Sequence, residues 1–108
     1  MYHAFHQYES ALTSYHAAIE INTELIEEMA TTNRRHEQAV LHIKVGDVHK
    51  DNKSYSEALE HFQYALGSYE ELISEAPIPI HHRGLQTAFS RINALRVCLL
   101  YTSDAADE

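Results

Sequence analysis

The sequence predicts an all-α protein of antiparallel helix-turn-helix repeats stacked as an α-solenoid. Three observations lead to this fold class. The 108 residues include three glycines and two prolines, which is little material for β-hairpin turns. Apolar residues recur at helical spacing over most of the chain. The chain also repeats itself at a fixed offset of 47 residues, as expected for stacked structural units.

The internal repeat is clearest when residues 8–28 are compared with residues 55–75. Eight of these 21 positions are identical: Tyr8/Tyr55, Ala11/Ala58, Leu12/Leu59, Ala18/Ala65, Glu24/Glu71, Leu25/Leu72, Ile26/Ile73 and Glu28/Glu75. A weaker echo relates residues 44–48 to residues 91–95. Because most identities fall on apolar positions, we expect a unit of about 47 residues to form the same structure twice.

Two long helices follow from this repeat. Residues 8–30 place apolar side chains three or four positions apart, and the first helix is expected over about residues 4–30. Residues 54–75 repeat the stripe, and Ser54 followed by Glu57 predicts a capping box at the start of this helix. Pro77 and Pro79 are expected to end it, because proline cannot continue the hydrogen-bond ladder.

A second type of helix is predicted over residues 35–50 and again over residues 81–97. The segment KDNKS at 50–54 forms the turn that leads into the next long helix. Each unit is therefore a shorter helix, a tight turn and a longer helix. One helical repeat domain is expected over residues 1–97.

The last eleven residues, CLLYTSDAADE at 98–108, have a separate interpretation. They resemble a translation of DNA that joins a transposon mosaic end to a shotgun-sequencing adapter. We therefore expect residues 98–108 to be a non-native tail and the chain to be a metagenomic fragment of a longer array. Without Asp104, Asp107 and Glu108 the formal net charge changes from −8 to −5, and the single cysteine, Cys98, is lost too.

The acidic composition narrows the possible functions. A net charge of −8 argues against nucleic acid as a partner, because a phosphate-binding surface needs an excess of Lys and Arg. The same charge argues against binding to anionic membranes. No apolar run approaches the roughly 18 residues of a spanning helix, and no signal peptide opens the sequence. The cytoplasm is the default expectation for location.

The stretch KVGDVHKDNKSYSEALEHF, residues 44–62, carries the most informative motif. Together with Ala65 it resembles the tetratricopeptide repeat (TPR), in a long-period, bacterial-type variant. The resemblance implies that Gly46 and Ala58 lie where two antiparallel helices approach closely. It also implies that Phe62 fills the wedge between them. Three positions depart from the family pattern, since His49 replaces Tyr, Asn93 replaces the second Gly and Glu70 replaces Pro.

The TPR resemblance implies a protein–protein interaction scaffold. Stacked units of this family form a curved superhelix whose concave groove holds a peptide or a partner helix. The family pattern places the first helix of each unit along that groove, which makes Val40, Ile43, Asp47, Lys50 and Asp51 the candidate partner-binding residues. Packing in the core would equally explain Val40 and Ile43, and a solvated helix end would explain Asp47 and Lys50. A contact from Lys50 to a carboxylate or a peptide C-terminus is the sharpest form of the hypothesis.

Two other functions and one other fold stay open. The chain would also suit a regulatory or sensor repeat region of a larger multidomain signalling protein. A His-rich metal-binding helical protein is the third functional alternative. A generic helical bundle shares the small-residue and aromatic contacts, so it remains the alternative fold.

Nine histidines need an explanation. His42 and His49 lie seven residues apart on one helical face, whereas His3/His6 and His81/His82 form short local pairs. Zinc needs three or four converging ligands, and no pair has a third ligand nearby in the sequence, so no metal site is expected. A pH-sensitive stability is expected instead, because histidine titrates near neutral pH.

No motif for catalysis appears in the sequence. It contains no Gly-rich phosphate loop, no HExxH and no nucleophile elbow, so no enzyme, no catalytic residue and no cofactor are expected. Repeat arrays bury their core between neighbouring units. A piece of such an array is therefore expected to expose apolar faces on its first and last helices.

Overall fold

The computed structural model describes the backbone of residues 2–107 and the side chains of residues 7–98. It contains four α-helices: α1 (Tyr2–Glu28), α2 (Thr32–Asp51), α3 (Tyr55–Glu75) and α4 (Pro79–Asp107). Within residues 2–107 there is no β-strand. The predicted all-α class is therefore confirmed.

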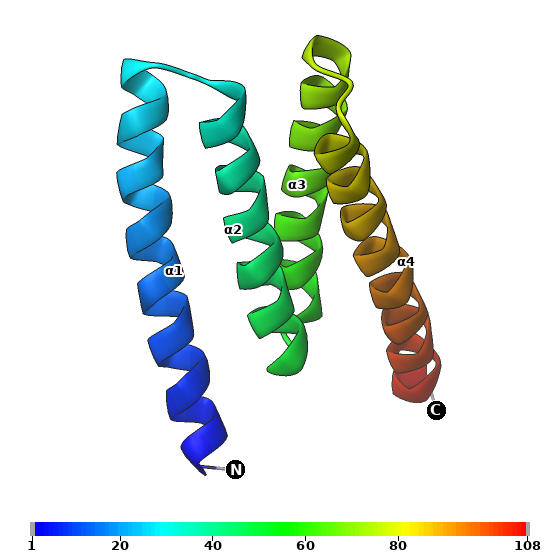
Figure 1. Cartoon of the computed structure of the whole chain (residues 1–108). Helices are drawn as coiled ribbons and strands as arrows, with labels where there is room; N and C mark the ends of the chain where they lie inside the picture. The colour runs from blue at the N-terminus through cyan, green and yellow to red at the C-terminus, as the bar shows by residue number, and fades with distance from the viewer. Residues whose placement is uncertain (1, 108) are drawn as a thin grey trace.

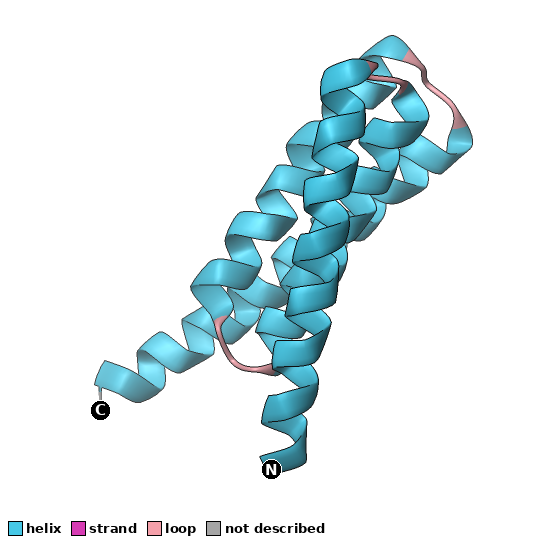
Figure 2. Ribbon diagram, turned by 90° about the vertical axis from the view of Figure 1, so that its left-hand side faces the viewer, coloured by secondary structure: helices cyan, strands magenta, loops and turns pink. Residues whose placement is uncertain are grey.

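The four helices lie side by side in chain order and alternate in direction (Figure 1). The most extensive contacts join α2 to α3, followed by α3 to α4 and α1 to α2, and α2 also touches α4. Figure 2 shows the short connections at the two ends of this array. Toward its C-terminal end α4 diverges from α2 and α3 in both views.

The helix boundaries repeat at the same offset as the sequence. The first residues of α2 and α4, Thr32 and Pro79, are 47 residues apart, and so are the last residues of α1 and α3, Glu28 and Glu75. In structural terms α1 is therefore the counterpart of α3, and α2 is the counterpart of α4. The first turns of α2 and α4 differ in sequence, yet both helices begin at the same position of the 47-residue unit.

The starts of α2 and α4 differ from the sequence expectation for identifiable reasons. Helix α2 begins at Thr32 rather than at residue 35, because the Thr31 hydroxyl caps it by accepting a hydrogen bond from the Arg34 N–H at 3.1 Å. Helix α4 begins at Pro79 rather than at residue 81, because proline suits the first turn, where its missing N–H is not needed. Helix α4 also continues past residue 97, the expected end, to Asp107.

The turn between α2 and α3 is a Schellman motif rather than the predicted capping box. The Ser54 N–H donates to the His49 carbonyl at 2.7 Å, and the Lys53 N–H donates to the Lys50 carbonyl at 3.0 Å. This geometry places Lys53 in the left-handed region, with a φ of 64°. The Ser54 side chain makes no cap hydrogen bond. The helix C-terminus therefore sets the turn, and the expected Ser54–Glu57 box is wrong.

Helix α3 supplies the centre of the core. Its inward face is fully buried at Ala58, Phe62, Ala65, Tyr69 and Leu72. From α2 and α4 this face meets buried small and aliphatic residues, namely Ala39, Ile43, Ala88, Ile92 and Leu95. At roughly 25 cal/mol per Å² of apolar surface removed from water, this contact is the main stabilisation available to the chain.

Two glycines allow the close approach of the helices to α3. A Cβ at Gly46 of α2 would lie 2.5 Å from Cε1 of Phe62, which confirms that Phe62 fills the space beside this glycine. On the other side of α3, a Cβ at Gly84 of α4 would collide with the ring of Tyr69. Gly84 has no counterpart in the predicted motif. The rings of Phe62 and Tyr69 on α3 thus fill the space beside Gly46 of α2 and Gly84 of α4, where neither glycine has a side chain.

Large apolar side chains are exposed on the two outer helices. They are Ile21 and Leu25 on α1, Met29 directly after α1, and Ile80, Phe89 and Val97 on α4. The expectation of uncovered apolar faces on the first and last helices is therefore confirmed. Within the described part of the chain, no helix combines the length and apolar character needed to cross a bilayer.

Candidate functional site

A groove runs between α2 and α4, over the edge of α3. Its main cleft has a volume of about 420 Å³. The lining side chains come from all three helices: His36, Val40, Ile43, Lys44, Asp47, Tyr69, Ile80, Arg83, Gly84, Thr87 and Arg91. A second hollow of about 540 Å³ shares His36, Val40, Lys44 and Ile80 and extends the groove along α2 past Glu37. We call these residues together the α2/α4 groove.

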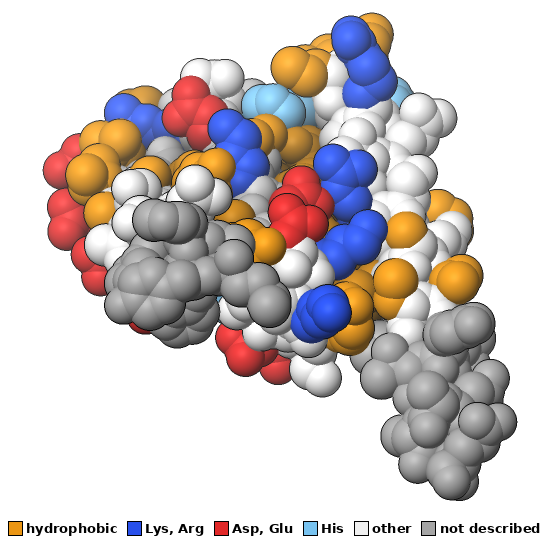
Figure 3. Space-filling model, turned by 90° about the horizontal axis from the view of Figure 1, so that it is seen from below, with side chains coloured by type: hydrophobic (Ala, Val, Ile, Leu, Met, Phe, Trp, Pro, Cys, Tyr) orange, Lys and Arg blue, Asp and Glu red, His pale blue; other side chains and the backbone are white. Residues whose placement is uncertain are grey.

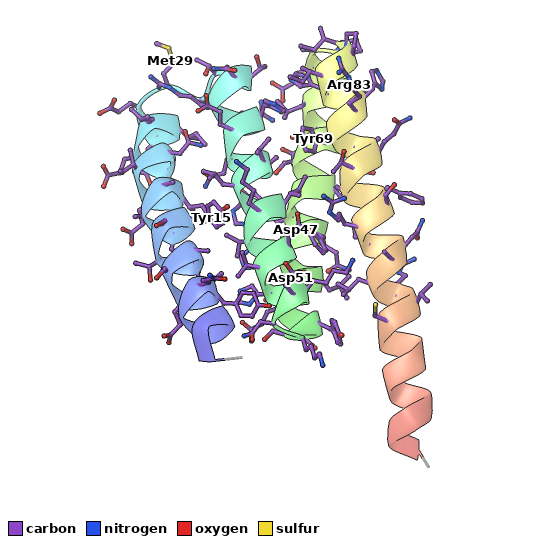
Figure 4. All side chains as sticks on the ribbon, turned by 60° about the horizontal axis from the view of Figure 1, so that its bottom comes forward. Tyr15, Met29, Asp47, Asp51, Tyr69 and Arg83 are labelled. Atoms are coloured by element: carbon purple, nitrogen blue, oxygen red, sulfur yellow. The ribbon has the colours of Figure 1, made fainter. Side chains whose placement is uncertain are left out.

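The repeat explains why both walls of the groove are helices of the same type. At the offset of 47 residues, Lys44 corresponds to Arg91 and Val40 corresponds to Thr87. The groove is therefore lined by equivalent faces of two successive units. Figure 4 shows Asp47 and Arg83 on the two walls, with Tyr69 of α3 between them.

The floor of the groove is held by a polar contact between Tyr69 and His36. The Tyr69 hydroxyl lies 3.0 Å from His36 Nδ1. Burial raises the pKa of Tyr69 to about 12, so its hydroxyl keeps its proton and donates. Burial, followed by the nearby His81, lowers the pKa of His36, so this imidazole is neutral and accepts. The contact fixes the Tyr69 ring above Gly84.

Positive charge dominates the main cleft. Its lining includes three cations, Lys44, Arg83 and Arg91, and one carboxylate, Asp47. Asp47 is already engaged by Arg91, with Nε–Oδ1 at 2.8 Å and Nη2–Oδ2 at 3.4 Å. Among the described side chains neither Lys44 nor Arg83 has an ion-pair partner, which leaves both available to an incoming anion.

The charges of the whole chain are segregated by helix type. All eight Lys and Arg residues lie on α2, on α4 or in the turn at Lys53, whereas α1 and α3 carry none. In contrast, α3 and the described part of α1 carry five glutamates each. Figure 3 shows several Lys and Arg side chains in the middle of the molecule and toward its right, and Asp and Glu along its left edge, in the centre and at the bottom. The groove is thus a basic surface on an acidic protein.

The five candidate residues from the sequence do not all reach this groove. Val40, Ile43 and Asp47 line the cleft, and Ile43 is also part of the core. Lys50 and Asp51 do not line it, and Asp51 lies one turn beyond Asp47 on α2 (Figure 4). The groove ends before them because α4 diverges from α2 in this direction and no longer provides the second wall. The backbone carbonyl of Asp51 instead accepts from the Tyr8 hydroxyl of α1 at 3.3 Å.

The α4 wall of the groove, including Arg83 and Arg91, was not predicted from the sequence. One signal for it was present, since the repeat already related Lys44 to Arg91. The uneven distribution of Lys and Arg along the chain was a second signal. The contribution of Tyr69 had no comparable signal, because the position of its ring at the floor of the cleft depends on the space left at Gly84.

A second cluster joins histidines from three helices on the far side of α2. His42 Nδ1 and His61 Nδ1 lie 2.9 Å apart. The ring of His61 also lies near His49 and His16, with centroid separations of 5.6 Å and 6.5 Å. The sequence paired His42 with His49, but the structure pairs it with His61. The contact across α2 and α3 holds one proton, since one Nδ1 must donate and the other must accept.

The histidine cluster is not arranged to bind a metal. Within the described residues, no three His, Cys, Asp or Glu side chains are placed to share an ion. His3 and His6 lie outside the described side chains.

No known family model, curated protein or solved structure matches this chain.

Proposed function

We propose that this chain is a TPR-like protein–protein interaction module, not an enzyme, whose α2/α4 groove binds an acidic peptide segment. The observation that carries the proposal is the pair of unengaged cations, Lys44 and Arg83, beside the apolar side chains of one groove. A peptide with carboxylates and apolar side chains would satisfy both features. The net charge of −8 favours a protein partner over nucleic acid or an anionic membrane, because both of those would repel an acidic chain.

The arrangement of the helices supports a stacked array over a closed four-helix bundle. A closed bundle would bring the first and last helices together around one core. Here the described part of α1 packs on α2, and α3 and α4 share the core on the other side of α2. The radius of gyration of 15.2 Å also exceeds the about 13 Å expected for a compact domain of this length. An open array presents a groove along one face.

The two ends of the groove suit different parts of a peptide. Arg91 is held in place by Asp47, so it offers a fixed guanidinium with little further loss of side-chain entropy on binding. Lys44 and Arg83 are flexible and exposed, and they suit carboxylates at variable positions. Val40 and Ile80 provide the apolar contact between these charges. We propose that the peptide lies along α2, from the Ile80 end toward Asp47.

The test is a binding titration with defined peptides. A fluorescein-labelled peptide that alternates Glu with Leu is expected to bind, and its Lys/Leu counterpart is expected not to bind. Arg83→Glu should weaken binding of the acidic peptide by about tenfold, because a repulsive charge replaces an attractive one. Lys53→Glu, an equal charge change in the α2–α3 turn outside the groove, is the matched control. Equal losses in both variants, or chemical-shift changes centred on α1, would refute the groove as the binding site.

A further inference from the structure

Within the described residues, helices α1 and α4 each have an uncovered side where their structural counterparts pack on another helix. Helix α3 packs on α2 in front of it, whereas no described helix packs on α1 in the corresponding place. Helix α2 is followed by α3, but α4 has no helix of the α3 type after it within the described residues. An α1 helix from a second copy, placed after α4, would form the same kind of pair as α2 and α3.

The charges of α1 and α4 differ in sign. The described part of α1 carries five glutamates and no Lys or Arg, whereas residues 79–98 of α4 carry three arginines and no Asp or Glu. Arg83 and Arg91 line the α2/α4 groove, so Arg96 and His82 are the exposed basic side chains of α4 that lie outside it. Within one copy, the acidic helices α1 and α3 alternate with α2 and α4, which carry the cations. Adding a second copy after α4 continues this alternation.

The ion pairs between α2 and α3 indicate which residues would meet. Arg35 of α2 lies 2.7 Å from Glu75 and 3.5 Å from Glu71 of α3, measured from its terminal nitrogens to their carboxylate oxygens. At the offset of 47 residues, Arg35 corresponds to His82 of α4. Glu71 and Glu75 correspond to the identical residues Glu24 and Glu28 of α1. The repeat therefore places His82 opposite two carboxylates of the next copy.

Apolar side chains lie beside these charges on both faces. Leu25 of α1 is the counterpart of Leu72, which is fully buried, yet Leu25 is 37% exposed. Phe89 of α4 is the counterpart of His42, which lies in the α2/α3 contact, and it is 55% exposed. Phe89 also borders a hollow of about 540 Å³ that Leu66 and Leu85 line. Burial of these residues would supply the apolar part of a new contact.

One residue limits how closely the copies can approach. Asn93 of α4 stands where α2 has Gly46, the position at which Phe62 packs directly against the helix backbone. A side chain there holds a partner helix farther away. The contact between copies is therefore looser than the contact between α2 and α3.

We propose that α4 of one copy docks on α1 of a second copy, head to tail, in the arrangement that α2 and α3 have within one chain. The occupant is a second copy of this chain, because the two faces match each other in helix type, charge and exposed apolar side chains. Such an interface is heterologous, so each bound copy leaves one face of each kind open for the next. The assembly grows with concentration rather than stopping at a two-fold dimer.

Sedimentation velocity of the full chain from about 10 µM to about 1 mM tests this proposal. The mean mass is expected to rise with concentration and to fall when sodium chloride is raised to about 1 M, because salt screens the attraction between the α1 glutamates and the basic side chains of α4. His82→Glu on α4 and the double variant E24K/E28K on α1 should each remain monomeric. An equimolar mixture of these two variants should associate again, since each then offers the face that the other needs.

Control variants separate this interface from a general effect of charge. Gln63→Glu lies on the exposed side of α3, and Glu27→Lys lies off the proposed face of α1, so both should associate as the parent chain does. The double variant H82R/N93G gives α4 the residues that α2 has at the equivalent positions, Arg35 and Gly46. It should tighten association by about tenfold. A chain that stays monomeric at every concentration overturns the proposal. Association that survives His82→Glu, or a mixture that stays monomeric, overturns the head-to-tail geometry.

Discussion

Acid should destabilise this protein through the contact between His42 and His61. Burial, then the nearby His61 and His16, lowers the pKa of His42 from 6.5 to about 4. The pKa of His61 is also lowered by burial and by His49 and His16, against the opposing effect of Glu60 and Glu57. The ring of Tyr64 covers His42 at a centroid distance of 3.9 Å. A second proton on the pair would set two N–H groups facing each other across 2.9 Å.

The sign and the size of the effect follow from linkage. The unfolded chain binds a proton at His42 near pH 6.5, whereas the folded chain binds it only near pH 4, so stability is complete above pH 6.5 and falls as the pH drops toward 4. For a pKa that shifts from 6.5 to about 4, lowering the pH from 8 to 5 removes about 2 kcal/mol of unfolding free energy. His42 is partly exposed, so we halve this figure to about 1 kcal/mol for solvent screening. The loss from His61 does not add fully, because the two rings titrate as a pair.

Thermal unfolding followed by circular dichroism measures this loss. A loss of about 1 kcal/mol lowers the melting temperature of a domain of this size by about 5 °C. His42→Phe removes the titrating ring and uses the residue found at the equivalent position, Phe89, so its melting temperature should change less between pH 8 and pH 5. His82→Gln, on an exposed residue outside the cluster, should retain the full pH dependence. Equal melting temperatures at pH 8 and pH 5, or equal slopes for the parent and His42→Phe, would refute the argument.

Three substitutions test the backbone and packing arguments by urea denaturation. Lys53→Gly should stabilise the fold by about 1 kcal/mol, because glycine adopts a φ of 64° without the strain that lysine carries there; a lower urea midpoint would contradict this. Gly46→Ala should destabilise by about 1–3 kcal/mol, because its Cβ would lie 2.5 Å from Phe62 in a filled core. Gly67→Ala should stabilise by about 1 kcal/mol through helix propensity, because its Cβ would meet nothing within 4 Å. If Gly46→Ala and Gly67→Ala shift the urea midpoint in the same direction, the packing explanation is ruled out.

The backbone was the most predictable part of this protein. Helix type and order follow from apolar periodicity, and the equal spacing of Thr32 and Pro79 follows the repeat seen in the sequence. The ends of the helices were less predictable. Thr31 and Ser54 are both good capping residues, yet Thr31 caps α2 while Ser54 makes no cap hydrogen bond. Such competition between a side-chain cap and the preceding turn is decided by backbone geometry that residue identity does not specify.

The groove was half predictable. Val40, Ile43 and Asp47 were identified from one helix by its resemblance to a repeat pattern, and they line the cleft. Lys50 and Asp51 satisfy the same pattern but fall outside the cleft, because the direction of α4 ends the groove before it reaches them. A helix crossing angle depends on how side chains of two helices interlock, so a pattern on one helix cannot supply it.

By itself the sequence determined the helical class, the unit of 47 residues and the small and aromatic residues at the closest contacts, because periodicity and side-chain size act over neighbouring positions. Only the tertiary structure decided that His42 meets His61, that Tyr69 rests in the space at Gly84 and that Lys44 and Arg83 face one cleft. These encounters join residues 19, 15 and 39 positions apart in the chain, on different helices. Their distances are set by how closely each pair of helices can pack, which is a property of both partners together.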